Sequence, residues 1–440
     1  MGSQRGATTA ILGGGVTGLA AAMTSGLPVF EASLGPGGIC ASYYVRPGSS
    51  ERLPRPSEDD EAYRFEVGGG HWIFGGDPDV LARLTQLAPM RSYVRSSAVH
   101  LREPEMLVPY PLQDHLDALP VAIGARAIKE MLATDSGAQA SPTMAGWLEA
   151  TFGPTLGQLF FLPFHERYTA GLVHEIAPQD PDKSPIDRRA LTHGAAERTR
   201  AVGYNPTYLY PVEGLDSLIR AMAAGTDVHH GMRLVRIDGA RGQLEFANGA
   251  TVPYERVLST LPLDQVLAMA GLSVGPVDPS TAVVVINIGA ERGARCPEEH
   301  WVYEPHSTSG FHRVGIYSNV DASFLPAAAR HAGDRVAIYV EHSRRRSAIP
   351  GPDEQHDLAA ATVAELQAMG TIGETEVVDP TVVPVAYTWS SPGSPWRARA
   401  LAALADIGVD QIGRYGRWRF QGIADSVRDG WAAGSEARTR

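Results

Sequence analysis

A glycine-rich segment near the N-terminus constrains the fold of this 440-residue chain more than any other feature. A short apolar strand, the motif G-G-G-V-T-G and an apolar helix follow one another within residues 9–23. In such a unit Gly13 permits a tight turn, Gly15 lets the backbone approach a pyrophosphate, and Gly18 lets the helix pack on the strand. A second short strand ends in Glu31, where a carboxylate can accept hydrogen bonds from an adenosine ribose. This order predicts a dinucleotide-binding βαβ unit, with a simple glycine-rich turn as the alternative.

The composition indicates a large globular protein and excludes several functions. At roughly 150 residues per domain, the chain has room for two or three domains. The net charge of −11 disfavours general binding to nucleic acid or to an anionic membrane. The two cysteines, Cys40 and Cys296, are too few and too far apart for a disulfide framework or a structural zinc site. With no apolar run of roughly 18 residues and no leader pattern, we expect a soluble cytoplasmic protein without a metal.

A second glycine pair, Gly37-Gly38, follows Glu31 closely. Such a pair is typical of flavoproteins, because the extended FAD needs another close approach of the backbone. From this point the sequence resembles the superfamily of FAD-dependent amine oxidases, protoporphyrinogen oxidases and UDP-galactopyranose mutases. The resemblance implies non-covalently bound FAD, with Gly38 among its contacts.

The resemblance also implies the domain organisation. It predicts an α/β fold with a discontinuous Rossmann-like FAD-binding domain of the glutathione-reductase type and an inserted α+β substrate domain. The FAD-binding domain would comprise residues 1–75, 210–265 and 405–440. Residues 76–209 would form a mainly helical substrate or cap region, and residues 266–404 a mixed-sheet substrate domain.

Two further segments resemble flavin-contacting parts of the mutases. The first, F-E-V-G-G-G-H-W-I-F at 65–74, resembles a loop whose glycine–histidine turn lies against the flavin ring, which implies cofactor contacts for Gly70 and His71. A hydrogen-bonded core histidine is the alternative for His71. The second, G-R-Y-G-R-W-R-F-Q-G-I-A-D at 413–425, resembles the C-terminal turn and helix. It implies that Gly413 and Ile423 contact the cofactor, and a weaker match places Leu234 at the adenine.

The substrate residues are implied by partial matches. Residues 161–169 resemble a mutase helix that carries Tyr168 into a nucleotide-sugar pocket, although the tryptophan that follows in mutases is absent here. The tyrosines of 204–215 and the segment F-H-R-V-G-I-Y-S at 311–318 extend the match. At the C-terminus Trp418 and Gly422 stand where mutases usually have a tyrosine and an acid. We therefore predict substrate contacts from Tyr168, Tyr208, Tyr210, Arg313, Tyr317, Arg414 and Trp418, and catalytic roles for His71, Arg313 and Arg414. The alternative to a substrate contact is simple packing for the tyrosines that precede the helix at 215–222. For Arg313 the alternative is an ordinary position on the surface.

The resemblance implies a flavin-dependent mutase that interconverts the pyranose and furanose forms of a nucleoside-diphosphate sugar. In such enzymes reduced flavin attacks the anomeric carbon through N5, so an external reductant such as NAD(P)H is expected, and a homodimer is compatible with the sequence. The alternative is an FAD-dependent oxidase or dehydrogenase. Amine oxidases of the superfamily usually have a lysine in the substrate domain, and no lysine follows Lys183 here. A third hypothesis is a flavoprotein without activity that serves as a binding partner.

Overall fold

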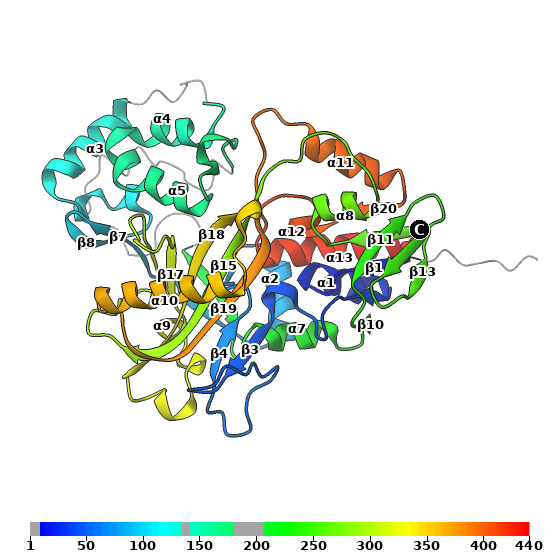
Figure 1. Cartoon of the computed structure of the whole chain (residues 1–440), viewed down its shortest axis with the longest axis horizontal. Helices are drawn as coiled ribbons and strands as arrows, with labels where there is room; N and C mark the ends of the chain where they lie inside the picture. Colours follow the sequence, from blue (N-terminus) through cyan, green and yellow to red (C-terminus); the bar gives the residue numbers. More distant parts are fainter. Residues whose placement is uncertain (1–8, 134–140, 180–205, 440) are drawn as a thin grey trace, which may run out of the picture.

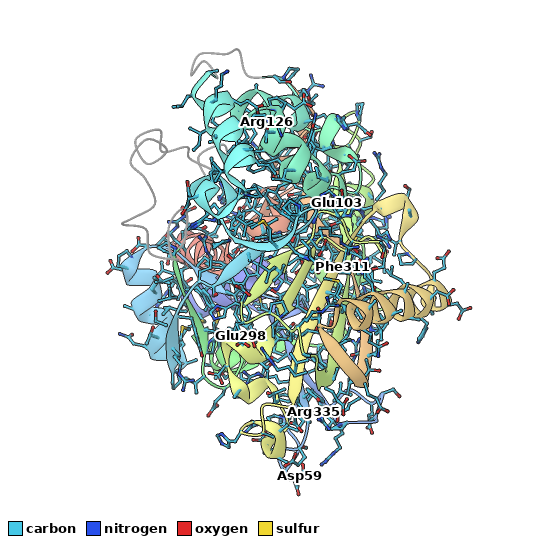
Figure 2. The ribbon with its side chains drawn as sticks, turned by 90° about the vertical axis from the view of Figure 1, so that its left-hand side faces the viewer. Asp59, Glu103, Arg126, Glu298, Phe311 and Arg335 are labelled. Carbon is cyan, nitrogen blue, oxygen red and sulfur yellow. The ribbon has the colours of Figure 1, made fainter. Side chains whose placement is uncertain are left out.

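The structure, a computed structural model, describes residues 9–133, 141–179 and 206–439. Figure 1 shows a small sheet with helices at one end, a large sheet in the middle, and a group of helices over the opposite end. In the orthogonal view of Figure 2, Arg126 lies in this helical group and Asp59 lies at the far end of the molecule. The chain therefore has the predicted mixed α/β composition.

A five-stranded parallel sheet forms the part that contains the glycine motif. Its strands, in spatial order, are β10 (Val228–His229), β2 (Val29–Phe30), β1 (Thr9–Leu12), β14 (Arg256–Ser259) and β20 (Val409–Gln411). The sheet thus joins strands from widely separated parts of the sequence. The domain boundaries proposed from the sequence stay predictions.

Two helices pack against each other beside this sheet. They are α1 (Val16–Ser25), which follows the glycine motif, and the C-terminal helix α13 (Ile423–Thr439). A Cβ atom at Gly430 or Gly434 would lie 2.3 Å from the Thr17 carbonyl oxygen or 2.2 Å from that of Ala21. Glycines at these positions therefore let the C-terminal helix approach α1 closely, which brings the C-terminal turn to the start of α1.

A seven-stranded mixed sheet forms the middle of the molecule. Its spatial order is β19 (Ile372–Thr388), β15 (Ser280–Arg292), β18 (Arg335–Arg345), β17 (Arg313–Ile316), β16 (Trp301–Tyr303), β7 (Ser97–Arg102) and β8 (Glu105–Pro109). Helix α10 (Pro352–Met369) covers one face of the sheet through an apolar core that includes Val314 and Leu366. Because side chains alternate along a strand, the neighbouring Arg313 points to the other face.

A helical cap lies at the end of the molecule opposite the parallel sheet (Figure 1). It contains α3 (Val121–Ala133), α4 (Met144–Leu156) and α5 (Leu162–Tyr168). A π-helical turn, Gly157–Phe161, links the last two helices, and α4 is kinked at Gly153, which has φ +76° before Pro154. The cap has its own core, built largely from aromatic and aliphatic side chains such as Phe152 and Leu156.

The remaining elements connect these parts. A two-stranded sheet pairs β3 (Ser42–Val45) with β4 (Tyr63–Glu66). One three-stranded sheet has the order β5 (Ile73–Phe74), β9 (Thr207–Pro211) and β6 (Met90–Val94). The other has the order β11 (Leu234–Asp238), β12 (Gln243–Phe246) and β13 (Thr251–Pro253). The other helices are α2 (Pro78–Leu87), α7 (Leu215–Ala223), α8 (Leu263–Met269), α9 (Tyr317–Val320), α11 (Trp396–Ala405) and α12 (Gly413–Gly416). Within the described ranges, no helix has the length and apolar character needed to cross a membrane.

Candidate active site

A cavity of about 600 Å³ runs between the glycine motif, the central sheet and the helical cap. Its size lies within the range of small-molecule and cofactor sites. The structure brings ten of the predicted site residues to its wall: Gly13, Gly15, Glu31, Gly38, Gly70, His71, Tyr168, Arg313, Arg414 and Ile423. Residues that are distant in sequence therefore form one site.

The glycine motif forms a cradle at one end of the cavity. A Cβ atom at Gly15 would meet no atom closer than the Gly37 carbonyl oxygen at 3.9 Å, so this position faces open space. Helix α1 starts at the next residue without a side-chain cap, and the N–H groups of its first turn have no partner within the helix. Open space in front of a helix N-terminus fits a pyrophosphate group. The donor set and the open space of the cradle thus fit the FAD that the sequence implies.

Glu31 fixes the same turn. Its Oε2 accepts a hydrogen bond from the Gly14 N–H at 2.7 Å, and its Oε1 accepts one from the Ser33 N–H at 2.7 Å. Each carboxylate oxygen has two lone pairs, so both can accept a further bond from a ribose hydroxyl. Gly18 lies behind this turn and outside the cavity wall, where a Cβ atom would be 1.9 Å from the Gly13 carbonyl oxygen.

The glycine–histidine turn lies further along the cavity. A Cβ atom at Gly70 would lie 2.0 Å from the Tyr339 hydroxyl, so only glycine lets this backbone pass the tyrosine. The His71 Nδ1 lies 3.3 Å from the Gly69 carbonyl oxygen and donates to it. Burial, together with the charge of Arg414, lowers the pKa of His71 to about 4. His71 is therefore neutral near pH 7, with its Nε2 left as an acceptor.

Arg313 is held by a buried carboxylate that the sequence analysis missed. Its Nε and Nη2 donate to Glu341 Oε2 at 3.1 Å and Oε1 at 2.5 Å, and His312 Nε2 lies 3.2 Å from the same carboxylate. Burial acts to raise the pKa of Glu341, but Arg313 and His312 outweigh it and lower that pKa to about 2. Glu341 is thus ionised, and the pair carries no net charge.

Arg414 has different surroundings. Its guanidinium donates to two backbone carbonyl oxygens, those of Gln421 at 3.2 Å and Ala386 at 2.9 Å, and its central carbon lies 4.6 Å from the Phe420 ring centroid. Among the residues that the structure describes, no carboxylate forms an ion pair with Arg414. The cavity therefore has one arginine neutralised by a glutamate and one whose charge is balanced only by carbonyl dipoles and aromatic rings.

Aromatic side chains of the cap and the central sheet form one wall of the cavity, which we call the aromatic wall. Phe164 is at its centre: its ring centroid lies 5.2 Å from that of Phe160, 5.2 Å from that of Tyr303 and 5.5 Å from that of Tyr168. The full set is Tyr110, Phe160, Phe164, Tyr168, Tyr303 and Tyr387. His165 beside it donates to the Phe161 carbonyl oxygen at 2.7 Å, and burial lowers the pKa of His165 to about 4. The wall therefore carries no charge near pH 7, and its polar groups are the hydroxyls of its four tyrosines.

Five predicted contact residues lie in the protein core and not at the cavity. The Tyr208 hydroxyl bonds to His300 Nδ1 at 2.7 Å, Tyr210 donates to Glu66, and Tyr317 donates to Asn287 Oδ1 at 3.3 Å. The Trp418 Nε1 donates to the Trp389 carbonyl oxygen at 3.1 Å. Leu234 belongs to the apolar core between β11 and the parallel sheet. Their polar atoms are satisfied inside the protein and their apolar surfaces are covered, so the structure places them away from the cavity wall, and their predicted contacts stay predictions.

Gly413 lies next to the cavity wall and not in it, and its predicted cofactor contact stays a prediction. It has φ +73°, its N–H donates to Asp429 Oδ2 at 2.7 Å, and a Cβ atom there would lie 2.7 Å from the Thr17 hydroxyl. It therefore sets the C-terminal turn against α1, next to the cavity wall. Within the described ranges, no group of three or more His, Cys, Asp or Glu side chains could hold a metal ion.

A glycine cradle joined to a cavity in an α/β fold defines the class of dinucleotide-cofactor proteins. The model of the family described as flavin containing amine oxidoreductase matches residues 27–319, which is more than half of the chain. The chain belongs to this family, and its fold is similar to that of a UDP-galactopyranose mutase, in agreement with the sequence resemblance. A search of curated proteins found no match.

Several solved structures share the fold. The crystal structure of a reduced UDP-galactopyranose mutase is similar at a TM-score of 0.81 and 20% identity, with 98% of this chain and 95% of that chain covered. A putative protoporphyrinogen oxidase from Exiguobacterium sp. has a TM-score of 0.67 and 14% identity, covering 100% and 99%. A fatty acid isomerase from P. acnes that produces CLA has a TM-score of 0.58 and 13% identity, covering 99% of each chain. At these identities the likeness shows the fold, and activity must be argued from the site.

Proposed function

We propose that the protein binds FAD non-covalently and is a flavin-dependent nucleotide-sugar mutase that interconverts pyranose and furanose forms. The observation that carries this proposal is Arg414, a cation without a carboxylate partner in the described part of the cavity. Such a charge in a partly desolvated wall favours an anionic ligand, and a guanidinium suits phosphate oxygens geometrically. The overall likeness to a mutase structure, which includes the cap, supports the same function.

The residues of the chain would have distinct roles. The cradle at Gly13 and Gly15, with Glu31, would hold the adenine dinucleotide end of FAD, and reduced flavin would supply a nucleophilic N5 for the anomeric carbon. The neutral His71 would accept a hydrogen bond through Nε2 without adding charge to the site. Arg414 would hold the diphosphate, and the aromatic wall would exclude water and stack with the planar base.

The second candidate is an FAD-dependent oxidoreductase that acts on an apolar substrate. The uncharged aromatic wall favours it, since a large apolar surface suits an apolar ligand as well as a base. The small number of lysines argues against an amine oxidase, since such enzymes usually have a lysine in the substrate domain. The chain contains only two lysines, Lys129 and Lys183, and Lys129 lies on α3 away from the cavity wall.

The deciding experiment compares the two redox states of the FAD-loaded protein. Dithionite-reduced protein, incubated with UDP-galactose or another nucleoside-diphosphate hexose, should form an isomer of unchanged mass without net consumption of reductant. The oxidised protein is the matched control and should form none. Stoichiometric hydrogen peroxide from an amine or other apolar substrate would instead establish the oxidoreductase.

A further inference from the structure

Gln421 contributes a buried polar group to the cavity wall that the proposed function has not used. The residue lines the cavity next to Phe420 and Gly422, and it is only 6% exposed. Its carboxamide oxygen is buried and has no hydrogen-bond partner among the residues that the structure describes. Buried polar groups are nearly always bonded, so an unpaired acceptor in a ligand cavity points to a partner supplied by the ligand.

The neighbourhood of this carboxamide identifies the chemistry of that partner. The backbone carbonyl oxygen of Gln421 accepts a hydrogen bond from Arg414 Nη1 at 3.2 Å, so the cation and the unpaired acceptor belong to the same turn. Arg414 attracts an anion, and a phosphate without a proton has acceptors only. A substrate that binds both groups would therefore carry a hydrogen-bond donor beside its anionic group.

A second buried glutamine shows that an unpaired carboxamide alone does not make a site. Gln411 on β20 is 7% exposed, and within the described ranges neither its carboxamide oxygen nor its nitrogen has a partner. It does not line the cavity, however, and its carbonyl oxygen accepts from Arg417, which pairs with Asp429. Only Gln421 combines the unpaired group with the cavity and with an arginine that lacks a carboxylate partner in the described structure.

We propose that Gln421 is a specificity-determining residue that hydrogen-bonds a hydroxyl of the substrate next to the anionic group bound by Arg414. The ligand class is a polyhydroxylated phosphate, which a glycosyl phosphate satisfies. A hydroxyl can donate to the carboxamide oxygen or accept from its NH₂ group, so it serves either orientation of the amide. This inference rests on the proposed function and assigns the sugar end of the substrate to the C-terminal turn.

The test measures the binding of two probes to FAD-loaded protein at constant ionic strength. Inorganic phosphate and glucose 1-phosphate are titrated separately, and the change in flavin absorbance gives each dissociation constant. The wild type should bind glucose 1-phosphate more tightly than phosphate. Gln421→Leu should weaken glucose 1-phosphate about tenfold and leave phosphate unchanged, because one hydrogen bond from a hydroxyl is lost.

Two further variants make the result specific. Gln411→Leu is the matched control and should change neither dissociation constant, since it removes an equally buried carboxamide away from the cavity. Arg414→Gln should weaken both probes, because both carry the phosphate. The ratio of flavin to protein, measured for every variant, reports whether the cofactor is retained.

Several outcomes would overturn the inference. It is wrong if Gln421→Leu leaves glucose 1-phosphate binding unchanged or weakens both probes equally, or if the wild type binds neither probe. It is also wrong if Gln421→Leu lowers FAD content without changing the preference for glucose 1-phosphate, since the carboxamide would then serve the cofactor. A protein that binds glucose 1-phosphate through Gln421 but forms no sugar isomer would support the inference and contradict the mutase function.

Discussion

At the scale of single residues, the Arg313–Glu341 pair combines a site position with a structural role. Arg313 forms a bidentate interaction with Glu341, which is 2% exposed. Removing one member of a buried ion pair leaves an uncompensated charge, which typically costs about 3–5 kcal/mol. We predict that Arg313→Ala lowers the free energy of unfolding by about this amount, as measured by urea denaturation followed by fluorescence.

The double variant Arg313→Gln/Glu341→Gln should recover most of that loss, because both charges are removed together. As a control, Arg46→Ala breaks an exposed pair with Asp59 and should leave the unfolding midpoint nearly unchanged. If Arg313→Ala unfolds at the same urea concentration as the wild type, the pair does not contribute as proposed. For activity assays the double variant is therefore the more informative one, since Arg313→Ala changes stability as well as the cavity.

These residues also show how far sequence reasoning reaches. His71 and Arg414 follow glycines in segments that resemble known flavin-contacting turns, and both line the cavity. Glu341 was missed because it meets Arg313 only through the register of β17 and β18, where the two residues are directly paired. The sequence signal that could have indicated Glu341 is the presence of an acid directly after the apolar run at 336–340. The sequence did not indicate that Tyr208 and Tyr210 lie in the core, because a tyrosine-rich strand looks the same whether it lines a pocket or packs in the core.

At the scale of elements, the strand–turn–helix unit makes two neighbouring glycines differ in their roles. A Cβ atom at Gly15 faces open cavity space, whereas one at Gly18 would lie 1.9 Å from the Gly13 carbonyl oxygen. We predict that Gly15→Val folds normally but takes up no FAD, because its side chain fills the space that fits a pyrophosphate. Gly18→Val should instead lower the thermal unfolding temperature, because α1 can no longer pack on β1.

Flavin content after reconstitution and thermal unfolding of the cofactor-free proteins separate these two effects. Gly35→Val is a suitable control, since a Cβ atom there meets no atom within 4 Å. Normal flavin content in Gly15→Val would contradict the assignment of the cradle. This unit was predictable because its pattern is local, and α1 begins within the predicted motif. The π-helical turn that places Phe160 and Phe161 in the cap carries no comparable local pattern.

At the scale of the whole molecule, the site exists because segments far apart in sequence fold together. The cavity wall takes residues from the N-terminal glycines, the cap, the central sheet and the C-terminal turn. Resemblance to a family predicted which segments meet, but the partners inside the core depend on packing between sheets. Packing between these segments also buries several histidines. Their burial determines how the stability of the folded protein changes with pH.

The last prediction concerns this response. Burial lowers the pKa of His71, His165 and His300 to about 4, and that of His342 to about 3, from an ordinary value near 6.5. Between about pH 6.5 and 4 the unfolded chain therefore binds more protons than the folded protein, so stability falls as the pH falls. Glu66 acts in the opposite direction: burial raises its pKa to about 7, so it favours the folded state more as the pH falls toward 4.5. The four histidines outnumber it, and we expect the urea midpoint to drop steadily from pH 7 to pH 5.

His342 allows a clean test, because it lies under α10, away from the cavity, with its Nε2 2.9 Å from the Thr362 hydroxyl. His342→Gln keeps a polar side chain but cannot titrate. It should make the loss of stability with acid shallower by up to about 1.4 kcal/mol per pH unit, which is the contribution of one proton. Glu66→Gln should make the loss steeper, because it removes the opposing group. Urea unfolding at pH 7, 6 and 5 measures both slopes, and variants whose slopes match the wild type would show that these buried groups do not control the acid response.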